Sequence, residues 1–251
     1  MNADRWIRRF GPEHPTAPRL LLLPHAGGSA SYFHGLAREL TADFDVLCAQ
    51  YPGRQDRRHE PPLRTIAGLA DGIFAALGVP DRPTILFGHS MGAVLAFEVG
   101  LRLEAAGATH LRGVVLSGRR APTVPGPDDV HLRDDDGLVR EIRELSGTAG
   151  DVLRDRELMK LILPGLRADY QAVETYRMRV GACLRTPVSV LVGDADPRVR
   201  VADAHAWSAL TTGGATLRVF PGGHFYLDDR RGEVAEAIRD SADAFSAHAS
   251  A

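Results

Sequence analysis

The pentapeptide Gly88-His89-Ser90-Met91-Gly92 holds a serine between two glycines, where an apolar run gives way to a helical pattern. Residues 84–87 predict a buried strand, and the residues from 91 onward have helical periodicity. In this setting Gly-x-Ser-x-Gly is typical of a nucleophile elbow, whose flanking positions must be small. Such a turn lifts the Ser90 hydroxyl clear of the sheet. It also sets the Met91 N–H at a helix N-terminus, where that group can stabilise an oxyanion.

A serine hydroxyl is a weak nucleophile, so it needs a base, and the base needs a carboxylate to orient it. His224 follows the last predicted strand, and two glycines before it allow the loop to turn the imidazole towards the serine. Asp194 and Asp196 follow the preceding strand, at the sheet edge where α/β proteins bind ligands. Serine, acid and histidine in this order are typical of α/β-hydrolases. We therefore expect His224 to be the base, with Asp196 and Asp194 competing as the acid. Asp194 has an alternative role, which is to cap a turn or bond backbone amides.

An oxyanion hole needs two backbone donors. The Met91 N–H is one, and the second is expected from the loop after an early strand. Residues 24–28, Pro-His-Ala-Gly-Gly, form such a loop, with the Ala26 N–H as the predicted donor. His25 and His89 are expected to be structural neighbours of the site rather than bases.

The elements that must position these residues alternate along the chain. Short apolar runs and amphipathic stretches predict a mostly parallel sheet with helices on both faces. With 251 residues, the chain is long enough for one such domain, and we predict a single α/β-hydrolase domain over 1–251. The predicted strands are Leu20–Leu23, Phe44–Gln50, Thr84–Phe87, Gly113–Ser117, Val188–Val192 and Thr216–Phe220. The predicted helices are Phe33–Leu40, Ile66–Leu77, Met91–Ala106, Val201–Leu210 and Gly232–Phe245.

The alternation breaks once, between about 122 and 184, after a stretch rich in proline. An all-helical insertion between two sheet strands is best interpreted as a lid over the site, and an insertion without a role in access is the alternative. The apolar lid residues Leu158, Leu161 and Leu163, with Tyr170, indicate an apolar chamber. The predicted lid helices are Asp136–Leu145, Asp155–Leu163 and Leu166–Arg177.

The composition is that of an ordinary globular protein, with 44% hydrophobic and 25% charged residues. A net charge of −2 argues against a general nucleic-acid binder. We expect no membrane span, because no run is long and apolar enough, and a cytoplasmic location, because the N-terminus has no hydrophobic signal region.

Cys48 lies in an apolar strand and is expected to be a buried free thiol. No Cys/His spacing is typical of a metal site. We expect no metal and no cofactor. Without a coiled-coil pattern, a monomer is expected.

With these residues placed, the chain resembles the type II thioesterases of polyketide and non-ribosomal peptide synthesis, which are free-standing editing hydrolases. The resemblance covers nearly the whole chain. The serine pentapeptide is common to many hydrolases, whereas other blocks are much more specific. Those blocks are Pro24-His25-Ala26-Gly27-Gly28, Tyr51-Pro52-Gly53-Arg54 and Leu166-Arg167-Ala168-Asp169-Tyr170. Further matching blocks are Trp6-Ile7-Arg8-Arg9, Ser117-Gly118-Arg119-Arg120-Ala121-Pro122 and Gly222-Gly223-His224-Phe225-Tyr226.

The resemblance implies hydrolysis of acyl thioesters held on the phosphopantetheine arm of an acyl or peptidyl carrier protein. It assigns the triad to Ser90, Asp196 and His224 and the oxyanion donors to Ala26 and Met91. The preference for Asp196 over Asp194 comes from this match. Two alternatives remain: a carboxylesterase or acyltransferase on the same fold, and a non-catalytic protein that binds carriers.

Carrier proteins are generally acidic, so arginines are candidate docking charges. An equally good interpretation is a solvated face, or pairing with carboxylates within the fold. The candidates are Arg54, Arg57, Arg58, Arg119 and Arg120.

Overall fold

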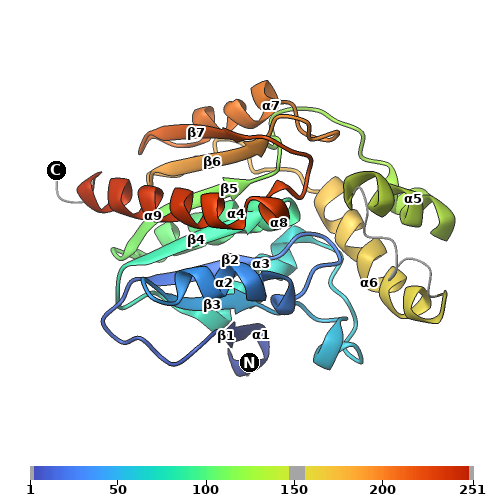
Figure 1. The fold of residues 1–251 in the computed structure, drawn as a ribbon, viewed down its shortest axis with the longest axis horizontal. Coiled ribbons are helices and arrows are strands. Elements are labelled where there is room, and N and C mark those ends of the chain that lie inside the picture. Colours follow the sequence, from blue (N-terminus) through green and yellow to red (C-terminus); the bar gives the residue numbers. More distant parts are fainter. Residues whose placement is uncertain (1–2, 147–155, 249–251) are drawn as a thin grey trace.

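A mostly parallel sheet forms the centre of the molecule (Figure 1), as the sequence predicts. The computed structural model describes residues 3–146 and 156–248. The seven-stranded sheet has the order β1-β3-β2-β4-β5-β6-β7, and its only antiparallel pair is β1 with β3. Strand β1 is not among the predicted strands, because its three residues are too few to show an alternation. The strands are β1 (Ile7–Arg9), β2 (Arg19–Leu23), β3 (Asp45–Ala49), β4 (Thr84–His89), β5 (Leu111–Ser117), β6 (Val188–Gly193) and β7 (Ala215–Phe220).

Helices cover both faces of this sheet, because successive strand residues point to opposite sides. On β2, Leu21 and Leu23 belong to one core cluster, and Leu20 and Leu22 belong to the other. The first cluster includes residues of α3 (Ile66–Leu77) and α4 (Met91–Ala105), and the second those of α2 (His34–Leu40) and α9 (Arg231–His248). Figure 1 shows α2 and α9 on the same side of the sheet. The shorter helices are α1 (Ala3–Trp6), α7 (Val201–His205) and α8 (Tyr226–Asp229), with 3-10 turns at 30–33, 55–57, 130–132 and 206–210.

Two predicted helices are shorter than expected, because part of each winds as a 3-10 turn. The predicted helix at 33–40 is preceded by the 3-10 turn Ala30–Phe33, and α2 itself begins at His34. The predicted helix at 201–210 divides into α7 and the 3-10 turn Ala206–Leu210. Such turns are common at helix ends, and hydrophobic periodicity does not distinguish them from α-helix.

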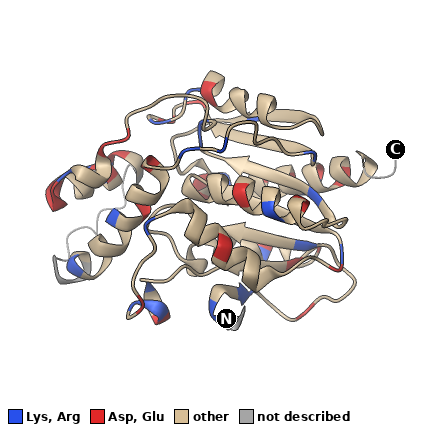
Figure 2. Ribbon diagram, turned by 180° about the vertical axis from the view of Figure 1, so that it is seen from behind, with Lys and Arg blue, Asp and Glu red and all other residues tan. Residues whose placement is uncertain are grey.

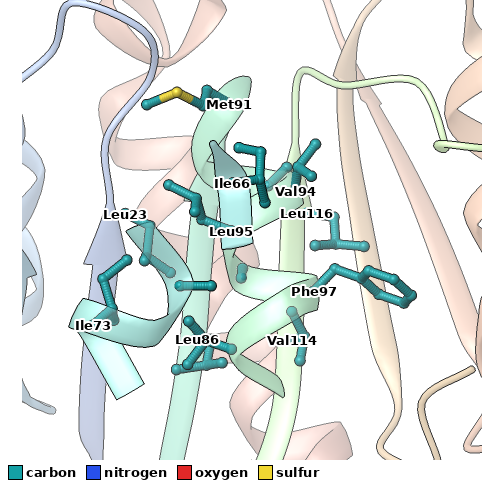
Figure 3. Close-up of a cluster of buried hydrophobic side chains, with 14 of the residues drawn as sticks. Leu23, Ile66, Ile73, Leu86, Met91, Val94, Leu95, Phe97, Val114 and Leu116 are labelled. Atoms are coloured by element: carbon teal, nitrogen blue, oxygen red, sulfur yellow. The ribbon is translucent and has the colours of Figure 1, made fainter. Parts of the chain in front are cut away.

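Helix α4 is buried along most of its length, which fixes the serine at its N-terminus. Figure 3 shows Val94 and Leu95 among side chains of α3 and the central strands. The Phe97 ring packs on Trp207, with ring centroids 5.3 Å apart. Val94, Leu95 and Phe97 are all at most 2% exposed. Packing this dense makes the start of α4 a rigid platform.

The lid insertion is helical in its described part, where α5 (Asp135–Ser146) and α6 (Arg156–Glu174) lie together beside one end of the sheet (Figure 1). The prediction of two helices, 155–163 and 166–177, is wrong over the described residues: α6 continues through Pro164 and ends at Glu174. Proline removes one helical hydrogen bond, but it does not end this helix, because Leu163 and Leu166 on either side are both anchored in the lid core. The predicted start at Asp155 lies outside the described residues.

Three further expectations concern membrane, metal and thiol groups. No helix in 3–146 or 156–248 is long and apolar enough to cross a bilayer. The same residues contain no cluster of three or more His, Cys, Asp or Glu side chains arranged to hold a metal ion. Cys48 is a buried free thiol, as predicted, and Cys183 is also free.

Candidate active site

The elbow at Ser90 has the strained geometry that its sequence predicts. Ser90 has φ 57° and ψ −114°, a backbone conformation that few residues other than glycine adopt. A Cβ on Gly88 would lie 1.9 Å from the Gly92 carbonyl oxygen, and a Cβ on Gly92 would lie 1.9 Å from the Leu23 carbonyl oxygen. Both positions therefore require glycine. The Ser90 N–H donates to the Ser117 carbonyl at 2.8 Å, which ties the turn to β5.

His224 meets Asp196 and not Asp194. Asp196 Oδ2 lies 2.7 Å from His224 Nδ1, and both residues are buried. Asp196 Oδ1 accepts the Arg198 N–H at 2.8 Å, which holds the carboxylate in place. Asp194 is exposed and accepts the Gly222 N–H at 2.9 Å, the alternative role considered for it. The structure therefore separates two carboxylates that the spacing of the sequence left in competition.

Ser90 and His224 line the same cavity. In the described part of the chain no hydrogen bond joins the Ser90 hydroxyl to the His224 imidazole. Catalytic hydrogen bonds are often long without substrate and tighten in the complex. The two groups therefore face a common space where a reacting carbonyl can sit.

The His25 and His89 side chains lie near His224. The His89 ring centroid lies 5.1 Å from that of His224, and its Nδ1 lies 2.9 Å from the Ser117 hydroxyl. Burial, and then the nearby His224, lower the pKa of His25 to about 3. The same two causes lower the pKa of His89 well below its usual value. Both rings are thus neutral packing partners at neutral pH, which is the role the sequence analysis expects.

Of the two expected oxyanion donors, Met91 lies at the start of α4 and Ala26 lies in the loop after β2. Met91 is the first residue of α4, so no carbonyl within the helix accepts its N–H. In the loop after β2, Gly28 N–H donates to the His25 carbonyl at 2.9 Å and Gly27 N–H donates to Asp169 at 2.7 Å. Ala26 N–H makes no hydrogen bond within the described residues.

A buried ion pair fixes this loop to the lid. Asp169 on α6 is fully buried, and each of its oxygens accepts a hydrogen bond of 2.8 Å from the Arg54 guanidinium. The same Asp169 carboxylate accepts the Gly27 N–H, and Arg54 Nη1 donates to the Gly28 carbonyl at 2.9 Å. The three specific blocks of the sequence therefore meet at one carboxylate. The position of lid helix α6 and the path of the loop that carries Ala26 depend on each other.

The lid and the sheet enclose a cavity of about 180 Å³ above Ser90. Tyr170 lines it, as predicted for the apolar chamber. Leu161 does not, since it is 69% exposed, and Leu163 packs inside the lid instead. Nothing is described of the Leu158 side chain. The lid residues lining the cavity are Ile142, Leu145, Met159, Ile162, Leu166, Tyr170 and Val173, and Arg119 and Phe225 complete it with Ser90, His224 and the loop 25–27.

Most of the candidate docking arginines are engaged within the fold, which supports the pairing interpretation. Arg54 pairs with Asp169. Arg57, 4% exposed, pairs with Glu60 and lies over the Trp6 ring. Arg120 Nη2 lies 2.5 Å from Asp128 Oδ1. Arg58 is exposed and Arg119 lines the cavity.

An elbow serine on a mostly parallel sheet, with a buried Asp–His pair on the loops after later strands, defines an α/β-hydrolase. Residues 18–242 match the model of the thioesterase domain family, and the chain belongs to that family. Two relatives are a probable cadicidin biosynthesis thioesterase of Streptomyces griseus and the thioesterase PikA5 of Streptomyces venezuelae. The first is 47% identical, over 94% of this chain and 66% of the relative. The second is 46% identical, over 96% of this chain and 87% of the relative.

Among solved structures, the type II thioesterase BorB from the borrelidin biosynthetic cluster is 48% identical and superposes with a TM-score of 0.88. The match covers 96% of this chain and 99% of BorB. The predicted family and fold are therefore confirmed.

Sequence reasoning missed two features of the site. It singled out Arg54 and Asp169 in separate blocks but gave no sign that they form a pair. From the sequence, Arg119 is a candidate docking charge, with a solvated face or pairing within the fold as the alternative, whereas in the structure it lines the cavity beside Ser90. These charged residues all lie in blocks that match the family, but their spacing along the chain does not show which loops meet in the fold.

Proposed function

We propose that the protein hydrolyses acyl thioesters carried on the phosphopantetheine arm of a carrier protein, and so clears aberrant or stalled acyl groups from a synthase. The observation that carries the proposal is the 2.7 Å contact between Asp196 and His224 at the cavity that also holds Ser90. Membership of the thioesterase family supports the thioester bond as the target. The proposal includes the cytoplasmic location expected from the sequence.

In the proposed acylation, His224 Nε2 removes the proton from the Ser90 hydroxyl as the oxygen attacks the thioester carbonyl. Asp196 holds the imidazole by its Nδ1 and stabilises the imidazolium. The Ala26 and Met91 N–H groups receive the negative oxygen of the tetrahedral intermediate. The carbon–sulfur bond then breaks, and the departing thiolate takes the proton from His224, which returns the imidazole to its neutral form. The acyl group stays on Ser90.

Water completes the proposed reaction. His224 takes a proton from a water molecule as it attacks the Ser90 ester, and the same two N–H groups receive the second oxyanion. The proton then returns to the Ser90 oxygen as the carboxylic acid leaves.

The distribution of charge on the surface is relevant to where a carrier protein docks. Figure 2 shows Lys and Arg interspersed with Asp and Glu over the ribbon. The exposed Arg58 contributes, with Arg54 and Leu161, to a second cavity of about 370 Å³ next to the lid. Within the proposal, this surface is the candidate docking area for an acidic carrier.

The decisive experiment is a hydrolysis time course. It compares short acyl groups on a phosphopantetheinylated carrier protein with the same groups as simple oxygen esters. We expect a strong preference for the carrier thioester. Equal or faster cleavage of the oxygen esters, with no benefit from the carrier, would indicate a general carboxylesterase. Transfer of the acyl group to an added alcohol or amine in preference to water would indicate an acyltransferase.

The two competing carboxylates give a ranked prediction. Asp196→Asn should reduce kcat by about 10⁴-fold, the cost measured for the matching change in another serine hydrolase, because an amide favours the wrong imidazole tautomer. Asp194→Asn should cost less than about tenfold, because an amide oxygen still accepts the Gly222 N–H. Steady-state kinetics on one thioester tests the order. The reverse ranking would transfer the role of the acid to Asp194.

The Arg54–Asp169 ion pair gives a second prediction. Asp169→Asn keeps the shape of the side chain but removes the charge that holds Arg54 and the loop 24–28. Displacing the Ala26 N–H by a fraction of an ångström should lower kcat by about tenfold to a hundredfold. KM for a short thioester without carrier should change less, because the apolar cavity is intact. The measurement is kcat and KM, well below the thermal midpoint of each variant.

A matched control separates positioning from stability. Glu174→Gln alters another buried carboxylate of α6, which accepts the Val130 and His131 N–H groups and, within the described residues, makes no hydrogen bond with the loop 24–28. We expect Glu174→Gln to lower the thermal midpoint without a comparable fall in kcat. If the two variants lose kcat in proportion to their loss of stability, Asp169 has only a structural role.

The size of the cavity predicts a preference for short acyl groups. The cavity lined by Ser90 and His224 holds about 180 Å³, and an adjoining space lined by the same two residues adds about 40 Å³. Both volumes are small beside the range of about 300–1,000 Å³ typical of small-molecule sites. Ile142→Ala should enlarge the chamber and raise kcat/KM for octanoyl relative to butanoyl thioesters by about tenfold. Val139→Ala is the matched control, since Val139 lies on the same helix and packs on the lid core without lining the cavity. An unchanged ratio in Ile142→Ala would move the acyl chain out of this chamber.

A further inference from the structure

The backbone of Arg119 lies close to the turn that carries Ser90. It follows β5 after Gly118, which has φ +59° and donates its N–H to the Leu191 carbonyl at 2.9 Å. Its own carbonyl accepts the Trp207 indole N–H at 2.9 Å. Ser117, two residues earlier, accepts the Ser90 N–H through its carbonyl. The backbone of Arg119 is thus fixed on both sides, close to the elbow.

The Arg119 side chain borders three cavities, and the smallest of them, about 40 Å³, is also lined by Ser90 and His224. It lines the catalytic cavity with Ser90, His224 and Tyr170, and it lines an adjacent cavity of about 270 Å³ that is rich in polar groups. A cation at this place sits at the boundary between the apolar acyl chamber and a polar space.

The acidic neighbours of Arg119 are already engaged. Asp128 pairs with Arg120 at 2.5 Å, and Glu174 contacts His131 Nδ1 at 2.6 Å and accepts two backbone N–H groups. In residues 3–146 and 156–248 no hydrogen bond or ion pair involves the Arg119 guanidinium. Burial, and then Arg120, lower the pKa of Arg119 to about 10, so the group remains charged at neutral pH. A charged group that is partly removed from water and has no partner is energetically unfavourable, so a hydrogen-bond acceptor on a bound ligand would stabilise it.

We propose that Arg119 is a specificity residue that binds an acceptor oxygen on the acyl group close to the thioester, either a keto oxygen or a carboxylate. This inference rests on the proposed function. The acyl group is the part of the substrate that enters the chamber, and the planar guanidinium offers several donors suited to such oxygens. The phosphate of the carrier arm is not the partner, since the whole pantetheine chain separates it from the thioester carbonyl beside Ser90.

The test uses pantetheine thioesters in pairs of similar length. One pair is butanoyl and 3-oxobutanoyl, and the other is pentanoyl and succinyl. The readout is the ratio of kcat/KM within each pair, because this ratio does not depend on the active fraction of a preparation. Arg119→Met removes the charge and keeps an unbranched stem. Arg119→Lys keeps the charge without the planar fork.

For each pair, the ratio is kcat/KM of the oxygenated thioester divided by kcat/KM of the plain one. For at least one pair we expect this ratio to be higher in the unmodified protein than in Arg119→Met. The ratio should fall by about tenfold to a hundredfold on this substitution, and Arg119→Lys should restore part of it. The pair that responds distinguishes a keto oxygen from a carboxylate. Arg120→Met, which alters a paired arginine next along the chain, should leave both ratios unchanged.

Equal ratios in the unmodified protein and Arg119→Met would overturn the inference and leave the proposed function intact. Equal shifts in Arg119→Met and Arg120→Met would also overturn it, by showing a general effect of charge. Absence of cleavage of every thioester, on pantetheine and on a carrier, would instead remove the proposed function and this inference with it.

Discussion

His224→Ala is expected to lower kcat for a thioester by several orders of magnitude. His224 is buried at 3% exposure, and Asp196 holds its imidazole. The nearby imidazoles do not substitute for it, because burial lowers the pKa of His25 to about 3 and lowers that of His89 well below its usual value. A base whose conjugate acid is so strong has little capacity to remove the serine proton.

Single-turnover and steady-state assays measure this effect. His205→Ala is the control, because His205 is an exposed histidine on α7 outside the cavity. The thermal midpoint of His224→Ala should be recorded beside the rate, since the substitution leaves the Asp196 carboxylate buried without its imidazole. A folded variant that keeps a rate near that of the unmodified protein would remove His224 from the role of base.

Ser90→Ala should abolish formation of an acyl-enzyme and reduce hydrolysis to a residual rate. In another serine hydrolase, loss of the nucleophile costs about 10⁶-fold in kcat. The elbow itself should persist, because its conformation is imposed by the buried strand and helix on either side and by the Ser117 carbonyl. Mass spectrometry after mixing with an acyl carrier tests for the covalent adduct.

The same variant separates an enzyme from a binding protein. Carrier binding that persists in Ser90→Ala, with hydrolysis lost, is expected of the enzyme. Unchanged hydrolysis would reject the whole mechanism. If neither form hydrolysed any thioester but both bound carriers, the protein would be a non-catalytic accessory on a hydrolase fold.

Local features of the sequence were sufficient to predict the frame of the fold. The alternation of short apolar runs with amphipathic stretches located six of the seven strands. It missed β1, whose three residues pair antiparallel at the edge of the sheet. It also divided α6 at Pro164, because a proline usually ends a helix in the absence of tertiary support. Here Leu163 and Leu166 are buried in the lid core on both sides of the proline, and that packing outweighs the missing hydrogen bond.

The elbow shows what the sequence by itself determined about this protein. Gly88 and Gly92 are required by collisions within a few residues of backbone and one neighbouring strand, so the pattern reports the geometry directly. The order of serine, acid and histidine follows from the order of the strands. These properties are local or topological, and a single chain carries them without knowledge of which loops meet.

The tertiary structure alone decided which charged groups find partners. It joined His224 to Asp196 and gave Asp194 to the backbone of the histidine loop. It joined Arg54 to Asp169 across 115 residues, and it left Arg119 unpaired in the described cavity while Arg120 found Asp128. Ion pairs form over a few ångströms in space, and that distance is set by how the lid and the loops pack at the end of the sheet, which spacing along the chain does not encode.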